Sequence, residues 1–247
     1  MADLHGHTAL ITGASSGLGA HFARVLAEEG AAVVLAARRG DRLEELEAAL
    51  KGARVKSLVW DVTETGRIAE VFDTLEADDM SPDILVNNAG LQRAGRAVEA
   101  TPEDYDAVMD VNLKAPFFLA TEFARRRIAA GEGGRIINIA SVGATHVLPG
   151  GATYCMSKSA LVMMTRSLAR ELARHDINVN ALCPGYIETE LNARWWEMDG
   201  GKKQLAGFPR RRLAQAGDLD GALLLLAGSG GAAITGASLA VDDGQYI

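Results

Sequence analysis

The chain has 247 residues, 48% of them hydrophobic and 23% charged, which is enough to bury the core of an ordinary globular domain. No linker-like or low-complexity stretch divides it, so we expect one domain over residues 1–247. A formal net charge of −7 argues against a nucleic-acid surface, which needs a basic patch. The start lacks a signal-peptide pattern, and no apolar run, such as residues 222–227, is long enough for a membrane span. We therefore expect a cytoplasmic protein that contacts no membrane.

Short runs rich in Val, Ile and Leu alternate with amphipathic segments of helical length. Each run predicts a buried strand, and the runs cover residues 8–11, 32–36, 55–59, 84–86, 135–139, 178–182 and 238–241. The helical segments cover residues 18–29, 41–50, 65–75, 103–130 and 152–174. This alternation predicts an α/β fold of the Rossmann type: a doubly wound parallel β-sheet with helices on both faces, in three layers. Ligands of such sheets bind beyond the carboxyl ends of the strands.

Local signals mark several helix ends. Thr101 and Pro102 precede two acidic residues, a combination that starts a helix. Gly30 and Gly131 follow helical segments and predict where those helices stop.

A glycine-rich turn, residues 12–19, follows the first predicted strand and runs into the first helix. A backbone that approaches a pyrophosphate closely cannot carry Cβ atoms, and the helix start offers free N–H groups and a partial positive charge. The turn predicts a dinucleotide site made by Gly13, Ser15, Ser16, Gly17, Leu18 and Gly19. Its GxxxGxG spacing differs from the GxGxxG pattern, and taken alone it is equally compatible with a tight strand-to-helix connection.

The second strand leads into Ala37, Arg38 and Arg39. An acidic residue near this point favours NAD through the ribose hydroxyls, whereas arginine favours the additional phosphate of NADP. We therefore expect NADP as the cofactor, with NAD as the alternative. The competing interpretation is that both arginines form only the solvated start of the next helix.

With these motifs in order, the chain resembles the short-chain dehydrogenase/reductase family in its compact form, over essentially its whole length. The resemblance rests on residues 12–19, Asp61-Val62, Asn87-Asn88-Ala89-Gly90, Asn112, Ser141, Tyr154-x3-Lys158 and Pro184-Gly185. It implies an NAD(P)-dependent oxidoreductase that moves a hydride between nicotinamide and a carbonyl or secondary alcohol.

The expected catalytic residues are Asn112, Ser141, Tyr154 and Lys158. Tyr154 and Lys158 stand four apart on a predicted helix, hence on one face, and a nearby cation would stabilise a phenolate whose ordinary pKa is about 10. The resemblance implies that Tyr154 is the acid/base, that Ser141 polarises the substrate carbonyl, and that Lys158 also binds the nicotinamide ribose. It assigns Asn112 to a proton relay behind Lys158.

Further cofactor contacts are expected after the other strands. They are Asp61 and Val62 at the adenine, Asn88, Ala89 and Gly90 at the ribose and nicotinamide, and Pro184, Gly185, Ile187 and Thr189 at the carboxamide end. Asn87 is expected to tie strands together instead of touching ligand.

Substrate specificity is expected to lie in a mobile lid around residues 186–212 and on the rim before Tyr154. The expected substrate-binding residues are Ser141, Val142, His146, Leu148, Tyr154, Tyr186 and Trp195. For any one aromatic of the lid, packing against the body or a neighbouring subunit is an equal alternative.

The substrate class stays open between a ketone, a 3-oxoacyl thioester, a sugar and a steroid. Residues 135–191 look especially like the 3-oxoacyl carrier-protein reductases, whose acidic partner would need a basic landing surface. Glu132 and His175 weaken that interpretation, and the arginines at 125–127 keep it open. The alternative function is a catalytically silent dinucleotide-binding regulator or scaffold, but such proteins usually lack the tyrosine or lysine.

No metal is expected, since Cys155, Cys183 and the five histidines show no metal-site spacing. The resemblance implies a homo-oligomer, a tetramer or a dimer, formed through the two long helices and the C-terminal segments. Val162, Met163 and Met164 are compatible with such an interface or with the core.

Overall fold

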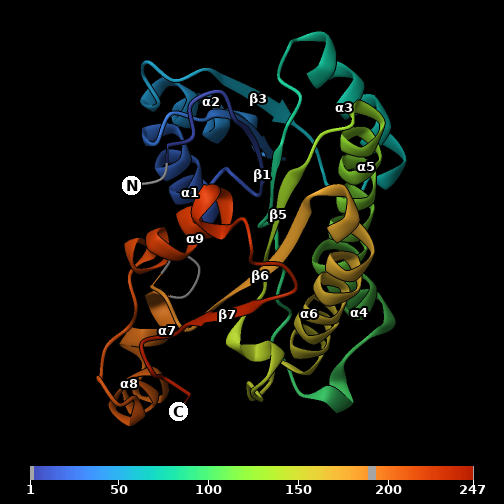
Figure 1. The fold of residues 1–247 in the computed structure, drawn as a ribbon. Helices are drawn as coiled ribbons and strands as arrows, with labels where there is room; N and C mark the ends of the chain where they lie inside the picture. Colours follow the sequence, from blue (N-terminus) through green and yellow to red (C-terminus); the bar gives the residue numbers. More distant parts are fainter. Residues whose placement is uncertain (1–2, 189–192, 247) are drawn as a thin grey trace.

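The computed structural model describes residues 3–188 and 193–246, and the strands within them form one seven-stranded sheet (Figure 1). All neighbouring strands are parallel and follow the order β3-β2-β1-β4-β5-β6-β7. The strands are β1 (Thr8–Thr12), β2 (Ala32–Ala37), β3 (Val55–Val59), β4 (Ile84–Asn87), β5 (Gly134–Ile139), β6 (Ile177–Pro184) and β7 (Ser238–Val241). Each predicted strand is found, which confirms the parallel sheet.

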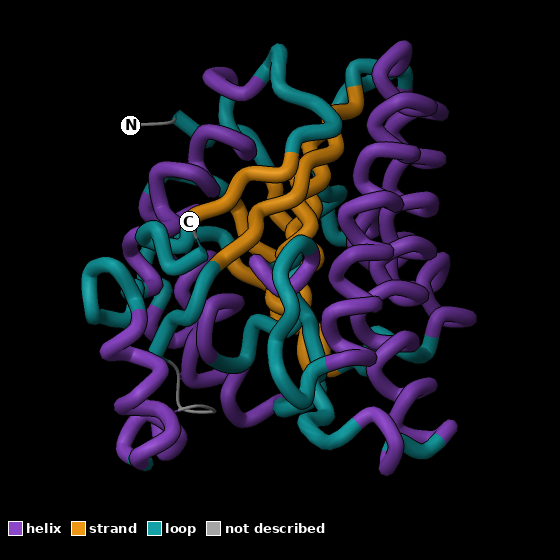
Figure 2. Tube along the Cα trace, turned by 90° about the horizontal axis from the view of Figure 1, so that it is seen from below, coloured by secondary structure: helices purple, strands orange, loops and turns teal. Residues whose placement is uncertain are grey.

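Helices cover both faces of the sheet, as expected for three layers (Figures 1 and 2). One buried cluster joins the sheet to α1 (Gly17–Glu28), α2 (Gly40–Ala49) and α9 (Asp220–Ala227). A second cluster joins the opposite face to α3 (Ile68–Ala77), α5 (Ala115–Ala130) and α6 (Ala152–Leu172). Two short helices, α7 (Ala193–Glu197) and α8 (Asp199–Gly207), follow β6 within the segment that was expected to form the lid.

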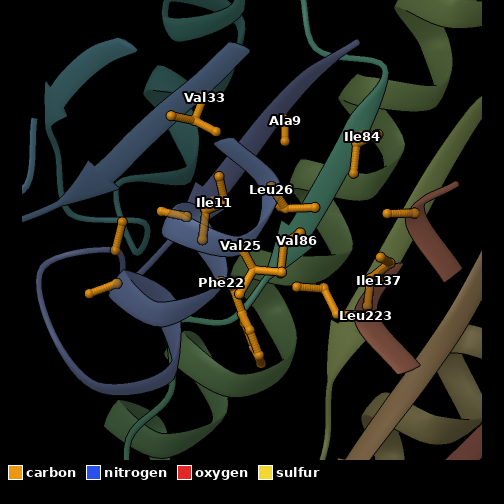
Figure 3. Close-up of a cluster of buried hydrophobic side chains, with 14 of the residues drawn as sticks. Ala9, Ile11, Phe22, Val25, Leu26, Val33, Ile84, Val86, Ile137 and Leu223 are labelled. Carbon is orange, nitrogen blue, oxygen red and sulfur yellow. The ribbon is translucent and has the colours of Figure 1, made fainter. Parts of the chain in front are cut away.

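The first core cluster shows why the strand and helix patterns specify this arrangement. Phe22, Val25 and Leu26 lie on one stripe of α1 and meet side chains of β1, β2, β4 and β5, as well as Leu223 of α9 (Figure 3). Phe22 and Leu26 are fully buried. Each such side chain contributes about 1.5–3 kcal/mol when removed from water, so the apolar stripe holds α1, and the turn before it, against the sheet.

The prediction of a buried strand is wrong for β3 and β7. Val59 of β3 is 64% exposed, and the residues of β7 alternate between exposed and half-buried. Both strands form edges of the sheet, so each lacks a neighbour on one side. The apolar composition of the two runs does not reveal their order in the sheet, and for this reason the sequence could not distinguish them from central strands.

The order of the strands places the ligand site. β1 lies between β2 and β4. The chain adds β2 and β3 on one side of β1 and then crosses over to add β4 and the later strands on the other side. Loops that leave the carboxyl ends of β1 and β4 therefore diverge at this point, which is where open α/β sheets bind ligands.

The predicted helix 103–130 is interrupted. It consists of α4 (Pro102–Met109), a π-helical stretch at Asp110–Lys114 and α5. Single π-helical turns often occur at functional sites because the additional residue re-aims a side chain. Here the stretch contains the buried Asn112.

Candidate active site

The glycine-rich turn has the conformation that a phosphate cradle needs. Gly13 and Gly17 lie in the left-handed region, with φ of 68° and 54°. A Cβ on Gly19 would lie 2.3 Å from the carbonyl oxygen of Gly13, so only glycine lets α1 start this close to the turn. The Ser16 side chain makes no capping hydrogen bond, which leaves the first N–H groups of α1 available. These residues fit the pyrophosphate of a dinucleotide.

A buried threonine joins this turn to the loop after β4. The Thr12 hydroxyl accepts hydrogen bonds from the backbone N–H groups of Asn88 and Ala89, both at 3.0 Å. The Asn88 side chain donates back to the Thr12 carbonyl at 2.9 Å. Asn88 therefore positions the two loops, and the backbone at Ala89 and Gly90 is the part that can approach a ligand. Sequence reasoning missed Thr12, because a threonine at a strand end has no special local pattern.

Asn87 ties strands together, as predicted: its amide donates to the side-chain oxygen of Asn138 on β5 at 2.8 Å. Both side chains are buried, so this bond fixes β4 beside β5 at the end of the strand that leads to Ser141.

At the place expected for the adenosine, the two arginines have different partners. The Arg39 guanidinium donates to the hydroxyls of Ser15 and Ser16, at 3.0 and 2.6 Å. Arg38 lies 3.6 Å from the Asp61 carboxylate. Burial alone would raise the pKa of Asp61, yet hydrogen bonds from Thr63 and the charge of Arg38 lower it. Val62 is buried beside Asp61. The turn, the arginines and the end of β3 thus meet at one edge, as predicted.

The three expected catalytic groups come together beside the end of β5. Lys158 lies one turn after Tyr154 on α6, with its Nζ 5.7 Å from the centre of the phenol ring. The Ser141 side chain hydrogen-bonds to Tyr154. Lys158 is buried, and its ammonium donates to the Ile139 carbonyl at 2.8 Å. The phenol, the ammonium and the serine hydroxyl therefore form one group.

The pKa values of this group are set mainly by burial. Desolvation raises the pKa of Tyr154, and the hydrogen bond with Ser141 opposes part of that shift. Desolvation also lowers the pKa of Lys158 to about 8. The pKa of Tyr154 is therefore raised, which is opposite to the shift expected from a neighbouring cation, because the loss of water around the phenol is the largest influence on it. At neutral pH Tyr154 is protonated and can donate.

Asn112 holds the loop after β4 against α6. Its side-chain oxygen accepts from the Leu91 N–H at 2.7 Å, and its amide donates to the Leu91 carbonyl and the Ser157 hydroxyl, both at 2.9 Å. A Cβ on Gly90 would lie 3.7 Å from both Asn112 Oδ1 and Lys158 Nζ. Asn112, Gly90 and Lys158 therefore converge at one place.

The expected carboxamide contacts follow β6. Pro184 ends that strand, and Ile187 is buried and pairs with Ala214. A Cβ on Gly185 would lie 2.4 Å from the side-chain oxygen of Gln245, so the C-terminal segment packs directly against this turn. Thr189 lies outside the described residues.

The expected substrate residues lie in two places, on the rim before Tyr154 and in the segment after β6. Val142 and Leu148 are buried, while His146 is exposed and its ring lies 4.8 Å from that of Tyr246. Tyr186 lies in an aromatic cluster with Trp196, Phe208 and Tyr246. Trp195 instead faces α8, where its indole N–H donates to Gln204 at 3.2 Å. Trp196, and not Trp195, thus contacts Tyr186.

Gln245 and Tyr246 are site residues that sequence reasoning missed. They reach the site only because the chain turns back after β7, and no local pattern signals such a contact.

Comparison with known proteins agrees with this geometry. A family model described as enoyl-(acyl carrier protein) reductase matches residues 13–245. The chain belongs to the short-chain dehydrogenase/reductase family. It is 38% identical to 2-dehydro-3-deoxy-D-gluconate 5-dehydrogenase of Dickeya dadantii, over 98% of this chain and 96% of that protein. It is 37% identical to 3-oxoacyl-(acyl-carrier-protein) reductase of Rickettsia bellii, over the full length of both.

Solved structures give the same result. Gluconate 5-dehydrogenase of Burkholderia cenocepacia, in complex with NADP and tartrate, has a TM-score of 0.91 and 37% identity, covering 98% of this chain and 96% of that one. The prediction of a short-chain dehydrogenase/reductase is therefore confirmed, and the chain is an oxidoreductase of the NAD(P)-dependent class.

Within residues 3–188 and 193–246, no three or more His, Cys, Asp or Glu side chains gather in a way that could hold a metal ion. None of the helices in this part of the chain has the length and apolar character needed to cross a bilayer.

Proposed function

We propose that this protein interconverts a secondary alcohol and a ketone on a small polyhydroxylated substrate such as a polyol or a sugar acid. The observation that carries the proposal is the contact of Tyr154 with both Ser141 and Lys158 at the carboxyl edge of the sheet, beside the phosphate cradle. The nicotinamide cofactor supplies or accepts the hydride when it is bound. The residues of the chain supply proton transfer and charge stabilisation.

In the reducing direction, Tyr154 donates its proton to the oxygen of the substrate as negative charge develops there. The raised pKa of Tyr154 keeps that proton in place until the substrate needs it. Ser141 donates a hydrogen bond to the same oxygen, and the nearby Lys158 ammonium stabilises the phenolate that remains. Asn112 binds the backbone of Leu91, and the preceding Gly90 lies beside Lys158, where a relay can return a proton to the tyrosine. Oxidation follows the same steps in reverse.

NADP is the proposed cofactor, with NAD as the alternative. Two guanidinium groups stand after β2 without an acidic side chain at position 37. Arg39 already contacts both turn hydroxyls, so Arg39, Ser15 and Ser16 form a cluster of donors that suits an additional phosphate. The expected contacts of Leu18, Asp61, Val62, Pro184, Gly185, Ile187 and Thr189 remain part of this proposal.

A sugar-type substrate is favoured over a carrier-bound 3-oxoacyl thioester. Arg125 and Arg126 both pair with Glu122, and Arg127 pairs with Glu132. Arg127 also donates to the Gly133 carbonyl, just before the start of β5, so this end of α5 lies at the amino edge of the sheet, away from Tyr154. These arginines are therefore neutralised and on the wrong edge to dock an acidic carrier protein near the site.

The alternative of a silent regulator finds no support. Ser141, Tyr154, Lys158 and Asn112 are all present and in mutual reach, and a dinucleotide-binding scaffold would have no need for this arrangement.

The finer features proposed for the molecule are a substrate lid over residues 186–212, a homotetramer and a cytoplasmic location. The lid proposal rests on Trp196 of α7 and on Phe208, which follows α8; the rings of both lie beside that of Tyr186. The tetramer proposal rests on exposed apolar side chains of α5 and α6: Phe117, Phe118, Ile128, Met156 and Met163. Both cysteines are free thiols, which suits a reducing compartment.

The test of the proposed reaction is Tyr154→Phe, which removes the acid/base hydroxyl and keeps the ring. We expect kcat to fall about 10³-fold, while NADPH binding measured by fluorescence is retained. Tyr105→Phe is the matched control, because Tyr105 is an exposed residue of α4. Unchanged turnover in Tyr154→Phe would remove this residue from the mechanism.

A further inference from the structure

The last residues of the chain form a tight turn that packs against the end of β6. Asp243 and Gly244 both adopt left-handed backbone conformations, with φ of 54° and 74°. The Gln245 N–H donates to the Asp242 carbonyl at 2.9 Å, and the Gly244 N–H donates to the Asp242 carboxylate at 3.0 Å. We call residues 242–246 the C-terminal turn. Figure 1 shows the chain end near α7 and α8, so the turn brings Gln245 back to the segment that follows β6.

The side-chain amide of Gln245 pairs with both backbone groups of Tyr186. Gln245 is only 8% exposed, and its side-chain oxygen accepts from the Tyr186 N–H at 2.6 Å. Its nitrogen donates to the Tyr186 carbonyl at 3.1 Å. The amide therefore acts on Tyr186 as a neighbouring strand acts on a residue of a sheet. An apolar side chain at position 245 would remove the acceptor of the Tyr186 N–H, which is costly in buried surroundings.

Gly185 has the size that this pairing requires. Its N–H donates to the Val241 carbonyl at 3.1 Å. A Cβ at this position would lie 2.4 Å from the side-chain oxygen of Gln245 and 2.8 Å from the Asp242 Cα. Only a residue without a side chain lets the Gln245 amide reach Tyr186. Gly185 and Gln245 are therefore complementary in shape as well as in hydrogen bonding.

The segment held in this way begins beside the catalytic residues. Ile139 of β5 pairs with Leu182 of the parallel strand β6, and the Ala140 N–H donates to the Leu182 carbonyl at 2.7 Å. Ser141 and residues 184–187 therefore leave the sheet side by side. Hydride transfer requires the nicotinamide ring to touch the carbon whose oxygen Ser141 and Tyr154 bind. Residues 184–187 thus border the place where the ring must lie, which agrees with the carboxamide contacts proposed above.

We infer that Gln245 is a positioning residue, which fixes the backbone of residues 184–187 in the orientation that receives the nicotinamide end of the cofactor. This inference rests on the proposed function and adds to it a residue from the far end of the chain. A carboxamide group needs donors and acceptors at defined places, and a segment that is ordered in advance loses less conformational entropy on binding. Without the Gln245 amide, affinity for the nicotinamide half should fall, while affinity for the adenosine half should not change.

The test compares two ligands of the intact protein by calorimetry. They are NADPH and 2′-phospho-ADP-ribose, which is the same molecule without the nicotinamide. We expect the wild type to bind NADPH more tightly, by at least about tenfold. Gln245→Met keeps most of the side-chain length and removes both hydrogen bonds. It should weaken NADPH binding roughly tenfold and change the affinity for 2′-phospho-ADP-ribose by less than about twofold. NADH and ADP-ribose form the corresponding pair without the 2′-phosphate, and they should show the same selective loss.

Asp243→Asn is the matched control within the C-terminal turn. The Asp243 carboxylate lies 3.0 Å from Arg210 and 2.7 Å from Arg212, and both arginines are more than half exposed. Exposed ion pairs contribute little, and asparagine tolerates the left-handed conformation, so both affinities should be unchanged. Arg39→Leu acts at the opposite end of the cofactor and should weaken NADPH and 2′-phospho-ADP-ribose by equal factors.

Gln245→Ala is a second variant, in which water can reach the peptide groups of Tyr186, and it should show the same selective loss even if Gln245→Met does not fold. Equal affinity changes for NADPH and 2′-phospho-ADP-ribose in the Gln245 variants, or no change for either ligand, would overturn the inference. The proposed reaction is tested separately. Unchanged ligand preference in the Gln245 variants, together with lost turnover in Tyr154→Phe, would refute the role of Gln245 alone. Turnover that persists in Tyr154→Phe would refute the reaction, whatever the binding results.

Discussion

Lys158 is a buried residue whose charge lowers the stability of the fold. Its ammonium is buried and donates to the Ile139 carbonyl, and burial lowers its pKa to about 8 from the ordinary 10.5. The folded state disfavours the charged form of Lys158. The residue therefore lowers the stability of the fold at every pH at which the lysine of the unfolded chain is protonated. Such a group persists at a site where its charge is needed.

We predict that Lys158→Met stabilises the cofactor-free protein at pH 7 and abolishes turnover. The relieved desolvation is worth about 3 kcal/mol and the lost hydrogen bond costs about 1–3 kcal/mol, so the net gain is about 1 kcal/mol. That gain should raise the melting temperature by about 2–4 °C.

The stability penalty of the buried Lys158 depends on pH in a direction that its lowered pKa determines. The penalty is fully present below pH 8 and is released as pH rises from about 8 to 10.5, the interval between the folded and ordinary pKa values. The advantage of the variant in chemical denaturation should therefore shrink across that interval. An advantage that stays constant from about pH 7 to 10 would show that desolvation of the ammonium is not its cause.

At the scale of elements, most boundaries follow from local chemistry. The Thr101 hydroxyl accepts from the Asp104 N–H at 3.1 Å and starts α4, as its capping pattern predicts. Gly131 adopts a left-handed conformation and ends α5. The connection from β2 to α2 is different, because it contains two adjacent arginines. Only the tertiary structure decides which of them reaches the glycine-rich turn.

We predict that Arg39→Leu weakens NADP binding roughly 10- to 100-fold, since hydrogen bonds to a charged group contribute about 1.5–3 kcal/mol. NAD binding should change little.

Combining Ala37→Asp with Arg38→Leu should shift preference toward NAD, because the new carboxylate can accept from the ribose hydroxyls. Dissociation constants from fluorescence titration measure both effects.

Arg42→Leu is the control for these variants, because Arg42 is an exposed residue of α2 that pairs only with Glu45 among the ion pairs of the described residues. Equal affinity of the unaltered protein for NAD and NADP would defeat the assignment of either arginine to the phosphate.

At the scale of the whole molecule, the two long helices present an outer face that the single chain leaves partly uncovered. Met163 is 58% exposed, whereas Val162 and Met164 are buried in the core, so only one of the three residues considered for an interface is available. A hollow between α5 and α6 is lined by Ala124, Ile128, Leu168 and Leu172 together with Thr121, Arg125 and Glu171. An apolar face of this kind favours association between copies of the chain.

We predict that Met163→Arg breaks the proposed tetramer into smaller species, because the substitution places a charge in each apolar contact. Light scattering should give four times the 26.1 kDa chain mass for the wild type and less for the variant. Val98→Arg, at a position 85% exposed on a different element, is the control. A wild-type chain that is monomeric would contradict the proposal.

The sequence by itself determined the seven strands, the helices between them and the residues that would meet at the carboxyl edge. Strand and helix patterns and the turn chemistry of glycine are local properties, and parallel topology then brings Gly13, Asn88, Ser141 and Tyr154 to one edge. Only the tertiary structure decided which strands are edges, that Arg39 reaches the glycine-rich turn, and that Tyr246 stacks on Tyr186. Those outcomes depend on contacts between residues far apart in the chain, whose free energy has no counterpart in any short stretch of sequence.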